Sequence, residues 1–193
     1  ATFDYIQRIL DLSLERVRSR ELTRIEEYFY RLVTYHEDMH GEAIIYTRQR
    51  LGYPAPAMLF GHGAPNSATV NSQFRYHDVP VIGGEFLLGA LSDSPFVFDN
   101  EKWAHSVELA PYSISATPVT NEQFKDFVDD HGYSREEFWS REGWVWREKS
   151  SAHHPTYWLF QGADGWFQYW FDQLIPLQPT QPVIHVNWYE AEA

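Results

Sequence analysis

Two histidines, His36 and His40, stand four residues apart in a segment that predicts a long helix. This spacing places both imidazoles on one helical face, about one turn apart, which suits two nitrogens that share one metal ion. The apolar residues around the pair follow the same helical period, so we expect both rings to point into apolar packing. Hydrogen-bonded core histidines are the alternative, because a buried imidazole needs partners of some kind. The residues of this face are Phe29, Leu32, Val33, His36, His40, Ala43, Ile44, Thr47 and Leu51.

Residues 1–52 predict two amphipathic helices that would carry this pair. Thr23 followed by Glu26 has the pattern of a capping box, which begins the second helix. Gly52 is expected to end it, with Pro54 just beyond. Two helices cannot surround a buried metal, and a four-helix arrangement needs two more than the chain supplies before Gly52. The apolar face of the first helix consists of Phe3, Ile6, Leu10, Leu14 and Val17.

Composition limits what the protein can be. The chain has 193 residues, 44% hydrophobic and 22% charged, which is enough to bury a core. A net charge of -12 without a basic cluster argues against nucleic acid as a partner. No apolar run has the length of a membrane span and no secretory signal opens the chain, so we expect no membrane partner and a cytoplasmic location. With no cysteine, any metal must be held by histidine, carboxylate or water.

The rest of the chain is mixed, and the whole predicts an α+β protein. Residues 1–55 form the helical domain, 56–78 a Gly- and Pro-rich linker, and 79–193 a second domain. In the second domain, residues 81–89 predict a strand pair or a bulged strand, and 107–115 alternate as one strand. Thr120 is expected to cap a short helix that ends near Asp130. From Gly132 onward, little regular period is visible.

Three sequence segments of the second domain resemble the domain shared by formylglycine-generating enzymes and ergothioneine sulfoxide synthases. They are residues 84–89 (GEFLLG), 118–124 (PVTNEQF) and 182–193 (PVIHVNWYEAEA), in the same order and with matching spacing. The resemblance implies a C-type-lectin-like α+β fold, which is poor in regular structure. It covers only the N-terminal portion of that domain. The half that supplies the active-site tyrosine and much of the substrate pocket is expected beyond residue 193.

The N-terminal helices resemble the DinB-like domain that precedes this domain in the ergothioneine synthase family. His36, His40 and Glu42 match that family's His-x-x-x-His-x-Glu segment, which implies that the two histidines are two of three ligands of a non-haem Fe(II). The third histidine is expected on a helix upstream of the chain, so the sequence resembles a fragment. Glu42 lies about 200° around the helix from His40, which favours a structural role. Met39 would either face the substrate or pack in the core, and no catalytic residue is assigned.

The resemblance implies an O2-dependent enzyme that joins selenium or sulfur to the imidazole C2 of hercynine. Residues 36–43 (HEDMHGEA) and 96–105 (FVFDNEKWAH) are closer to the selenoneine synthase branch, with an ergothioneine-type synthase that uses a thiol donor as the alternative. The small-molecule partners would be hercynine, a selenium or sulfur donor and O2. A catalytically inactive lectin-like binding module and a purely structural fragment are alternatives of other classes.

Other polar and aromatic residues favour structural roles. The carboxylates of residues 99–101 are expected to fix a loop rather than bind a cation. His153 and His154 are expected in an exposed loop, and His185 as a hydrogen-bonded core histidine within a strand. An aromatic cage for a quaternary ammonium is the alternative to core packing for the tryptophans. These tryptophans are Trp139, Trp144, Trp146, Trp158, Trp166, Trp170 and Trp188.

Overall fold

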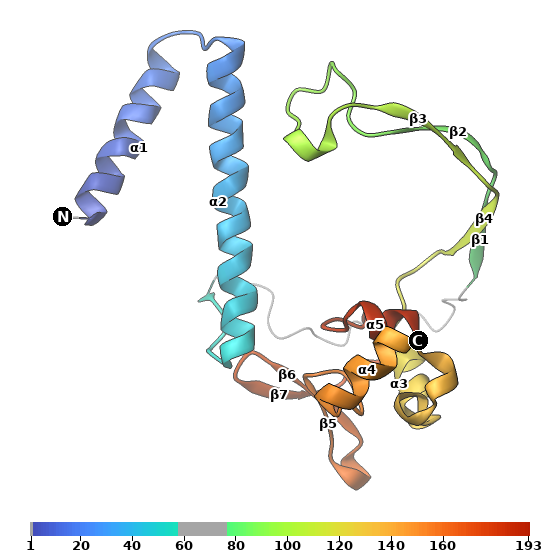
Figure 1. Cartoon of the computed structure of the whole chain (residues 1–193). Coiled ribbons are helices and arrows are strands. Elements are labelled where there is room, and N and C mark those ends of the chain that lie inside the picture. The colour runs from blue at the N-terminus through green and yellow to red at the C-terminus, as the bar shows by residue number, and fades with distance from the viewer. Residues whose placement is uncertain (1, 58–76) are drawn as a thin grey trace. The chain divides into compact units, whose positions relative to one another are not determined.

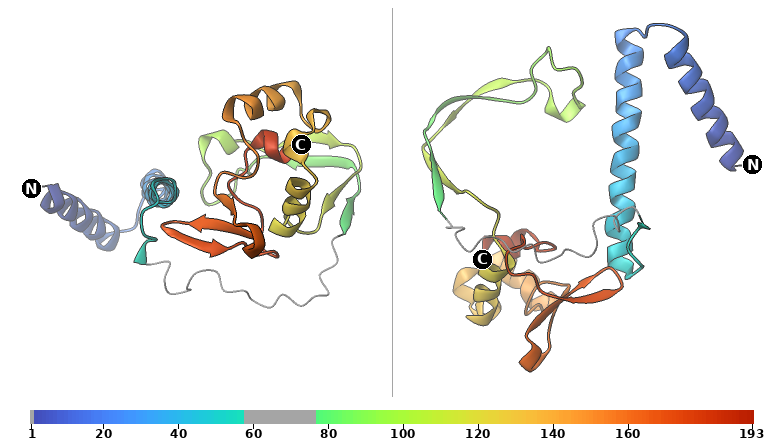
Figure 2. Two further views of the ribbon diagram at one scale, coloured as in Figure 1. Left: turned by 90° about the horizontal axis from the view of Figure 1, so that it is seen from below. Right: turned by 180° about the vertical axis from the view of Figure 1, so that it is seen from behind.

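A computed structural model describes residues 2–57 and 77–193, which contain helices together with three small antiparallel sheets (Figures 1 and 2). The fold is therefore mixed α+β, as the sequence predicts. The chain divides into two compact units, one of Ala1–Ile44 with Gly84–Leu109 and the other of Ile45–Gly83 with Ala110–Ala193. None of the described helices is long and apolar enough to cross a membrane.

The first unit contains α1 (Thr2–Ser19) and most of α2 (Arg24–Leu51). The predicted capping box begins α2: Thr23 Oγ1 accepts a hydrogen bond from Glu26 N at 3.3 Å, and Glu26 Oε2 accepts one from Thr23 N at 3.0 Å. Glu26 also pairs with the guanidinium groups of Arg16 and Arg20, at 2.8 and 2.5 Å. The Thr23 amide and these two cations hold the pKa of Glu26 well below its usual range. The turn between the helices is thus fixed around one carboxylate.

A two-stranded sheet and its connecting loop complete the first unit. Strand β2 (Gly84–Leu88) pairs antiparallel with β3 (His105–Leu109). The loop between them contains a short 3-10 helix, η2 (Asp99–Glu101), and places Phe96 against α2. The Phe96 ring stacks on Tyr28 with centroids 5.2 Å apart and contacts Tyr35 at 5.0 Å. Aromatic contact therefore holds the loop to the N-terminal half of α2.

The strands of residues 78–115 differ from the prediction of one continuous strand over 107–115. Strand β4 (Tyr112–Ser115) is separate from β3 and pairs instead with β1 (Asp78–Val81). The break falls at residues 110–111, because Pro111 has no N–H to donate and interrupts the ladder. Asp78, placed in the linker by sequence, is the first residue of β1, and most of that predicted linker lies outside the described residues.

The short helix predicted after Thr120 is confirmed as α3 (Asn121–Asp129) in the second unit. Thr120 Oγ1 accepts a hydrogen bond from Gln123 N at 3.4 Å, and Gln123 Oε1 accepts one from Thr120 N at 2.9 Å. Phe124 and Val128 of this helix are buried.

Residues 132–193 are more regular than their sequence indicates. The helices and strands of this segment are α4 (Arg141–Ser150), β5 (Trp158–Phe160), β6 (Trp166–Trp170), β7 (Gln173–Pro176) and α5 (Trp188–Glu192). Three 3-10 turns join them: η3 (Gly132–Ser134), η4 (Glu136–Phe138) and η5 (Gly162–Asp164). Strands β5, β6 and β7 form an antiparallel meander.

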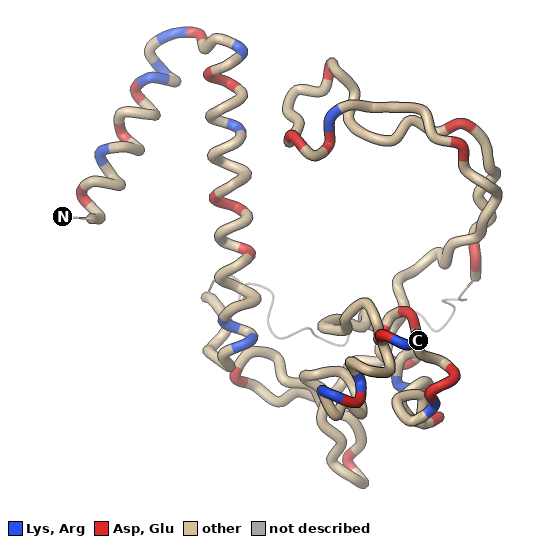
Figure 3. The backbone as a smooth tube through the Cα atoms, viewed as in Figure 1, with Lys and Arg blue, Asp and Glu red and all other residues tan. Residues whose placement is uncertain are grey.

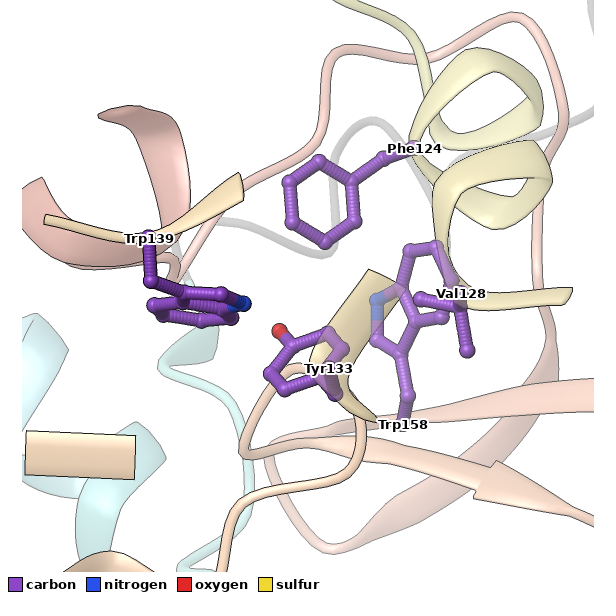
Figure 4. Packing of buried hydrophobic residues seen from close by; sticks show 5 residues of the cluster. All are labelled: Phe124, Val128, Tyr133, Trp139 and Trp158. Atoms are coloured by element: carbon purple, nitrogen blue, oxygen red, sulfur yellow. The ribbon is translucent and has the colours of Figure 1, made fainter. Parts of the chain in front are cut away.

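The core of the second unit is aromatic. Figure 4 shows Phe124 and Val128 of α3 facing the rings of Tyr133, Trp139 and Trp158, and these five residues are the buried cluster. A few large rings fill this core in place of many aliphatic side chains. Short elements therefore suffice to surround it.

Candidate functional site

His36 and His40 lie on one face of α2, as their spacing predicts. Their ring centroids are 4.4 Å apart and the ring planes are perpendicular. Two imidazoles that bind one metal at about 2.0–2.1 Å through nitrogen, at right angles to each other, have centroids roughly 4–5 Å apart. The observed separation therefore fits two ligands of a single metal ion.

The surroundings of the pair differ from the prediction of apolar packing. Both histidines are exposed among the described residues. Residues of the same predicted face are open as well, with exposed fractions of 55% for Phe29, 57% for Val33 and 61% for Ile44. The helical period correctly predicted the shared face of these residues, but no described part of the chain covers it.

A third protein ligand is not supplied by the described residues, which contain no group of three histidine or carboxylate side chains placed to hold a metal. Glu42 is exposed and Met39 has an exposed fraction of 47%. We refer to the pair of imidazoles as the half-site, because the described residues place no third potential ligand beside it.

The charge along α2 favours a cation at this half-site. Between Arg31 and Arg48 the helix has no lysine or arginine, while three carboxylates occupy this stretch (Figure 3). Negative side chains near a bound cation lower its electrostatic free energy. These acidic residues are Glu37, Asp38 and Glu42.

The structural roles predicted for the carboxylates of residues 99–101 are confirmed, and the exposure predicted for His153 and His154 is confirmed only in part. Glu101 Oε2 accepts a hydrogen bond from Phe98 N at 3.0 Å, and Asp99 pairs with Lys102 at 2.7 Å, so these carboxylates fix the loop as expected. His153 is exposed and His154 is half-buried.

The prediction for His185 is wrong. It lies in a bend with a left-handed φ of 62° rather than in a strand, and its side chain is exposed at one edge against Tyr157. The apolar neighbours in sequence predicted a strand, but the left-handed conformation turns the chain and prevents regular pairing.

Core packing is confirmed for most of the tryptophans. Trp139 and Trp158 are in the buried cluster, and Trp144, Trp146 and Trp166 pack against it. Trp188 departs from this prediction because its exposed fraction is 76%. It is the first residue of α5, whose buried residue is Glu190 instead.

No sequence pattern predicted the set of buried carboxamides in the second unit. Gln49 is the buried residue of α2: its Nε2 donates to Tyr169 O at 3.2 Å and its Oε1 accepts from Phe171 N at 2.8 Å. Asn121 and Gln168 are buried near it, around the same small cavity. An isolated glutamine or asparagine has no periodic pattern that marks it as buried.

Comparison with known proteins identifies the family. Residues 65–193 match the model of the sulfatase-modifying factor enzyme 1-like domain. The chain belongs to this family. It is 33% identical over 172 residues to a hercynine oxygenase of Mycolicibacterium thermoresistibile, which covers 87% of this chain and 36% of the relative. It is 32% identical over 174 residues to the hercynine oxygenase of Mycolicibacterium smegmatis, covering 85% of this chain and 37% of that protein.

The relatives of this chain also include a protein named as inactive. The inactive C-alpha-formylglycine-generating enzyme 2 of Mus musculus is 31% identical over 123 residues, which cover 58% of this chain and 39% of the mouse protein. The chain spans little more than a third of the hercynine oxygenases it matches. A continuous match over 87% of the chain must include its whole middle part, so His36 and His40 lie inside the region shared with the first hercynine oxygenase.

Proposed function

We propose that the protein containing this chain is an O2-dependent non-haem Fe(II) enzyme that oxidatively joins selenium or sulfur to C2 of hercynine. The observation that carries the proposal is the match to two hercynine oxygenases, which extends through the His36 and His40 pair. The imidazoles on α2 support it, because their separation of 4.4 Å is compatible with two ligands of one metal.

His36 and His40 would each bind the iron through one imidazole nitrogen. A third ligand would come from outside the described residues, as the resemblance to DinB-like domains implies. The uncovered apolar faces of α1 and α2 support the assignment of residues 1–55 to a larger helical bundle, with 56–78 as linker and 79–193 as the lectin-like domain. The bound Fe(II) would supply the activation of O2 that the coupling needs.

The chain's own residues would also orient a cationic substrate. Hercynine carries a quaternary ammonium, and the carboxylates of Glu37, Asp38 and Glu42 make the surroundings of the half-site negative. Met39 is adjacent to His40 and half-exposed, so it would contact substrate beside the metal. Holding both reactants in one place would supply much of the rate gain.

Selenium is the proposed donor element, and the similarity of residues 36–43 and 96–105 to selenoneine synthases supports it. A thiol donor, as in ergothioneine-type synthases, is the alternative. An inactive binding module is a second candidate function, favoured by the similarity to the inactive enzyme of Mus musculus.

Metal content and turnover of the full-length protein test the proposal together. Purified protein loaded anaerobically with Fe(II) should bind one iron per chain, and mixing with hercynine, O2 and a selenosugar should give a product with a carbon–selenium bond. Iron binding without product from either a selenosugar or a thiol would favour the binding module. Failure to bind iron would contradict the proposal.

A further inference from the structure

The loop of residues 89–104 joins β2 to β3 and contains the most buried residue of the first unit. Among the described residues of this unit, Val97 alone is buried, with an exposed fraction of 5%. Two backbone hydrogen bonds close the base of the loop, from Ala90 N to Glu101 O at 2.8 Å and from Ala104 N to Ala90 O at 3.0 Å. The loop is therefore tied firmly to its two strands.

Phe96 of this loop lies between two tyrosines of α2. Tyr28 and Tyr35 are seven residues apart, which places them on one helical face with a rise of about 10.5 Å between them. The Phe96 ring centroid is 5.2 Å from that of Tyr28 and 5.0 Å from that of Tyr35, which fits a ring placed between the two. Phe98 adds an edge contact to Tyr35, with centroids 6.1 Å apart. The loop thus holds α2 at two points, two helical turns apart.

This aromatic clamp, defined as Phe96 with Tyr28 and Tyr35, leaves the histidine face of α2 open. Contacts two turns apart resist both rotation of a helix about its axis and tilting of that axis, whereas a single contact resists tilting poorly. His36 and His40 follow Tyr35 by one and five residues, which places them about 100° and 140° around the helix from it. The clamp can therefore fix where both imidazoles point without covering them.

The clamp also links the half-site to the matched family domain. The loop lies inside residues 65–193, which match that domain, whereas α2 precedes them, and both belong to one compact unit. The ion pairs of Glu26 hold α2 ten residues before His36, whereas the contact of Phe96 reaches Tyr35, the chain neighbour of His36.

We propose that Phe96 is a positioning residue of the half-site, an inference that rests on the proposed function. Its ring acts through Tyr35 and the backbone of α2 rather than through contact with the metal. It fixes the direction of the His36 and His40 imidazoles, so that ligands from outside the described residues meet them in one geometry. Groups that orient the ligands of a metal change its affinity even though they do not bind it.

The variant Phe96→Ala of the full-length protein tests this role, with Fe(II) affinity as the first readout. It should bind Fe(II) about tenfold more weakly, the lower end of the range for groups that orient metal ligands. Phe96→Tyr keeps the aromatic ring and should restore the affinity to within about twofold of wild type. Phe86→Ala is the matched control, because this half-exposed ring of β2 lies outside the clamp, and its Fe(II) affinity should equal that of wild type.

The visible absorption of bound Co(II) is a second readout, because its bands depend on the arrangement of the ligands. The spectrum should change in Phe96→Ala and should not change in Phe86→Ala or Phe96→Tyr. All proteins are compared at a temperature at which circular dichroism shows them to be folded, so that a loss of stability alone moves neither readout. If Phe96→Ala does not fold, Phe96→Leu replaces it with the same expectations, since leucine keeps the apolar volume without the flat ring.

Three results would overturn the positioning role. Wild-type Fe(II) affinity and Co(II) spectrum in a folded Phe96→Ala would overturn it while leaving the ligand role of His36 and His40 in place. An equal loss of affinity in Phe86→Ala would show that the effect is not specific to the clamp. Wild-type protein that binds no Fe(II) would refute the proposed function, and the positioning role with it.

Discussion

At the scale of single residues, the spacing of His36 and His40 defines their relation to each other but not to the rest of the molecule. A separation of four residues places both side chains on one helical face, and in this structure the ring centroids are 4.4 Å apart. Their burial depends on contacts from distant parts of a fold, and no local period encodes these contacts. The geometry of the half-site was therefore predictable, while its exposure was not.

Replacement of His40 tests the ligand role most directly. In His40→Ala of the full-length protein, iron affinity should fall by at least about 10- to 100-fold, the range that even indirect changes near a metal produce. Turnover should then be lost. Helical content should persist, because alanine favours helix. Iron analysis, circular dichroism and product formation measure the three effects, and the exposed His153→Ala is the control.

Two results would contradict the ligand role of His40. A variant that retains both iron and turnover would show that the imidazole is dispensable. A variant that unfolds outright would show that the side chain is chiefly structural.

Tyr133 and Glu190 form a buried polar pair whose removal tests the core. The Tyr133 hydroxyl donates to Glu190 Oε1 at 2.6 Å, and the residues are 2% and 4% exposed. Tyr133→Phe should lower the free energy of unfolding by about 1.5–3 kcal/mol, since a buried carboxylate loses a hydrogen bond. Urea unfolding measures the change. Tyr112→Phe, at a half-exposed ring, should change stability by less than about 0.5 kcal/mol, and equal effects would refute the assignment.

At the scale of elements, the sequence predicted helices better than strands. The capping boxes at Thr23 and Thr120 marked two helix starts, because they combine local hydrogen bonds with local sequence. Strand pairing is set by distant partners, so the break at Pro111 between β3 and β4 was missed. The aromatic residues after residue 132 do not recur at helix or strand spacing. For this reason the sequence did not predict α4 or the β5–β7 meander.

The C-terminal end of α2 makes a testable contact with the β6–β7 hairpin of the same unit. In Gln49→Leu, Tyr169 O and Phe171 N each lose a hydrogen-bond partner in a buried place. The free energy of unfolding should fall by about 1–3 kcal/mol for each group left unsatisfied. Exchange of the Phe171 amide hydrogen should also become faster.

Hydrogen exchange measures the faster exchange at Phe171 in Gln49→Leu, and urea unfolding measures the lower free energy of unfolding. The exposed Thr47→Leu on the same helix is the control, and its effect on stability should be small. Unaltered exchange at Phe171 in Gln49→Leu would mean that the carboxamide does not hold the hairpin.

At the scale of the whole molecule, membership of the family does not specify the donor atom. Residues 65–193 match the sulfatase-modifying factor enzyme 1-like domain, and the chain is similar both to proteins named hercynine oxygenase and to a protein named as inactive. The identity of 33% to a hercynine oxygenase covers 36% of that relative, and it does not distinguish a selenium donor from a sulfur donor. The choice between them therefore needs a measurement on the full-length protein.

Supplying the two donors separately decides the branch. With Fe(II), O2 and hercynine present, a selenosugar as the only donor should give product. A thiol as the only donor should give product at no more than about a hundredth of that rate. The reason is that chemically distinct donors present different groups to the site's polar residues. Mass spectrometry distinguishes the products, since selenium has a characteristic isotope pattern. The His40→Ala protein is the matched blank for any uncatalysed coupling. Product from the thiol donor alone would assign the protein to the ergothioneine branch, and this result would leave the proposed ligand role of His36 and His40 unchanged.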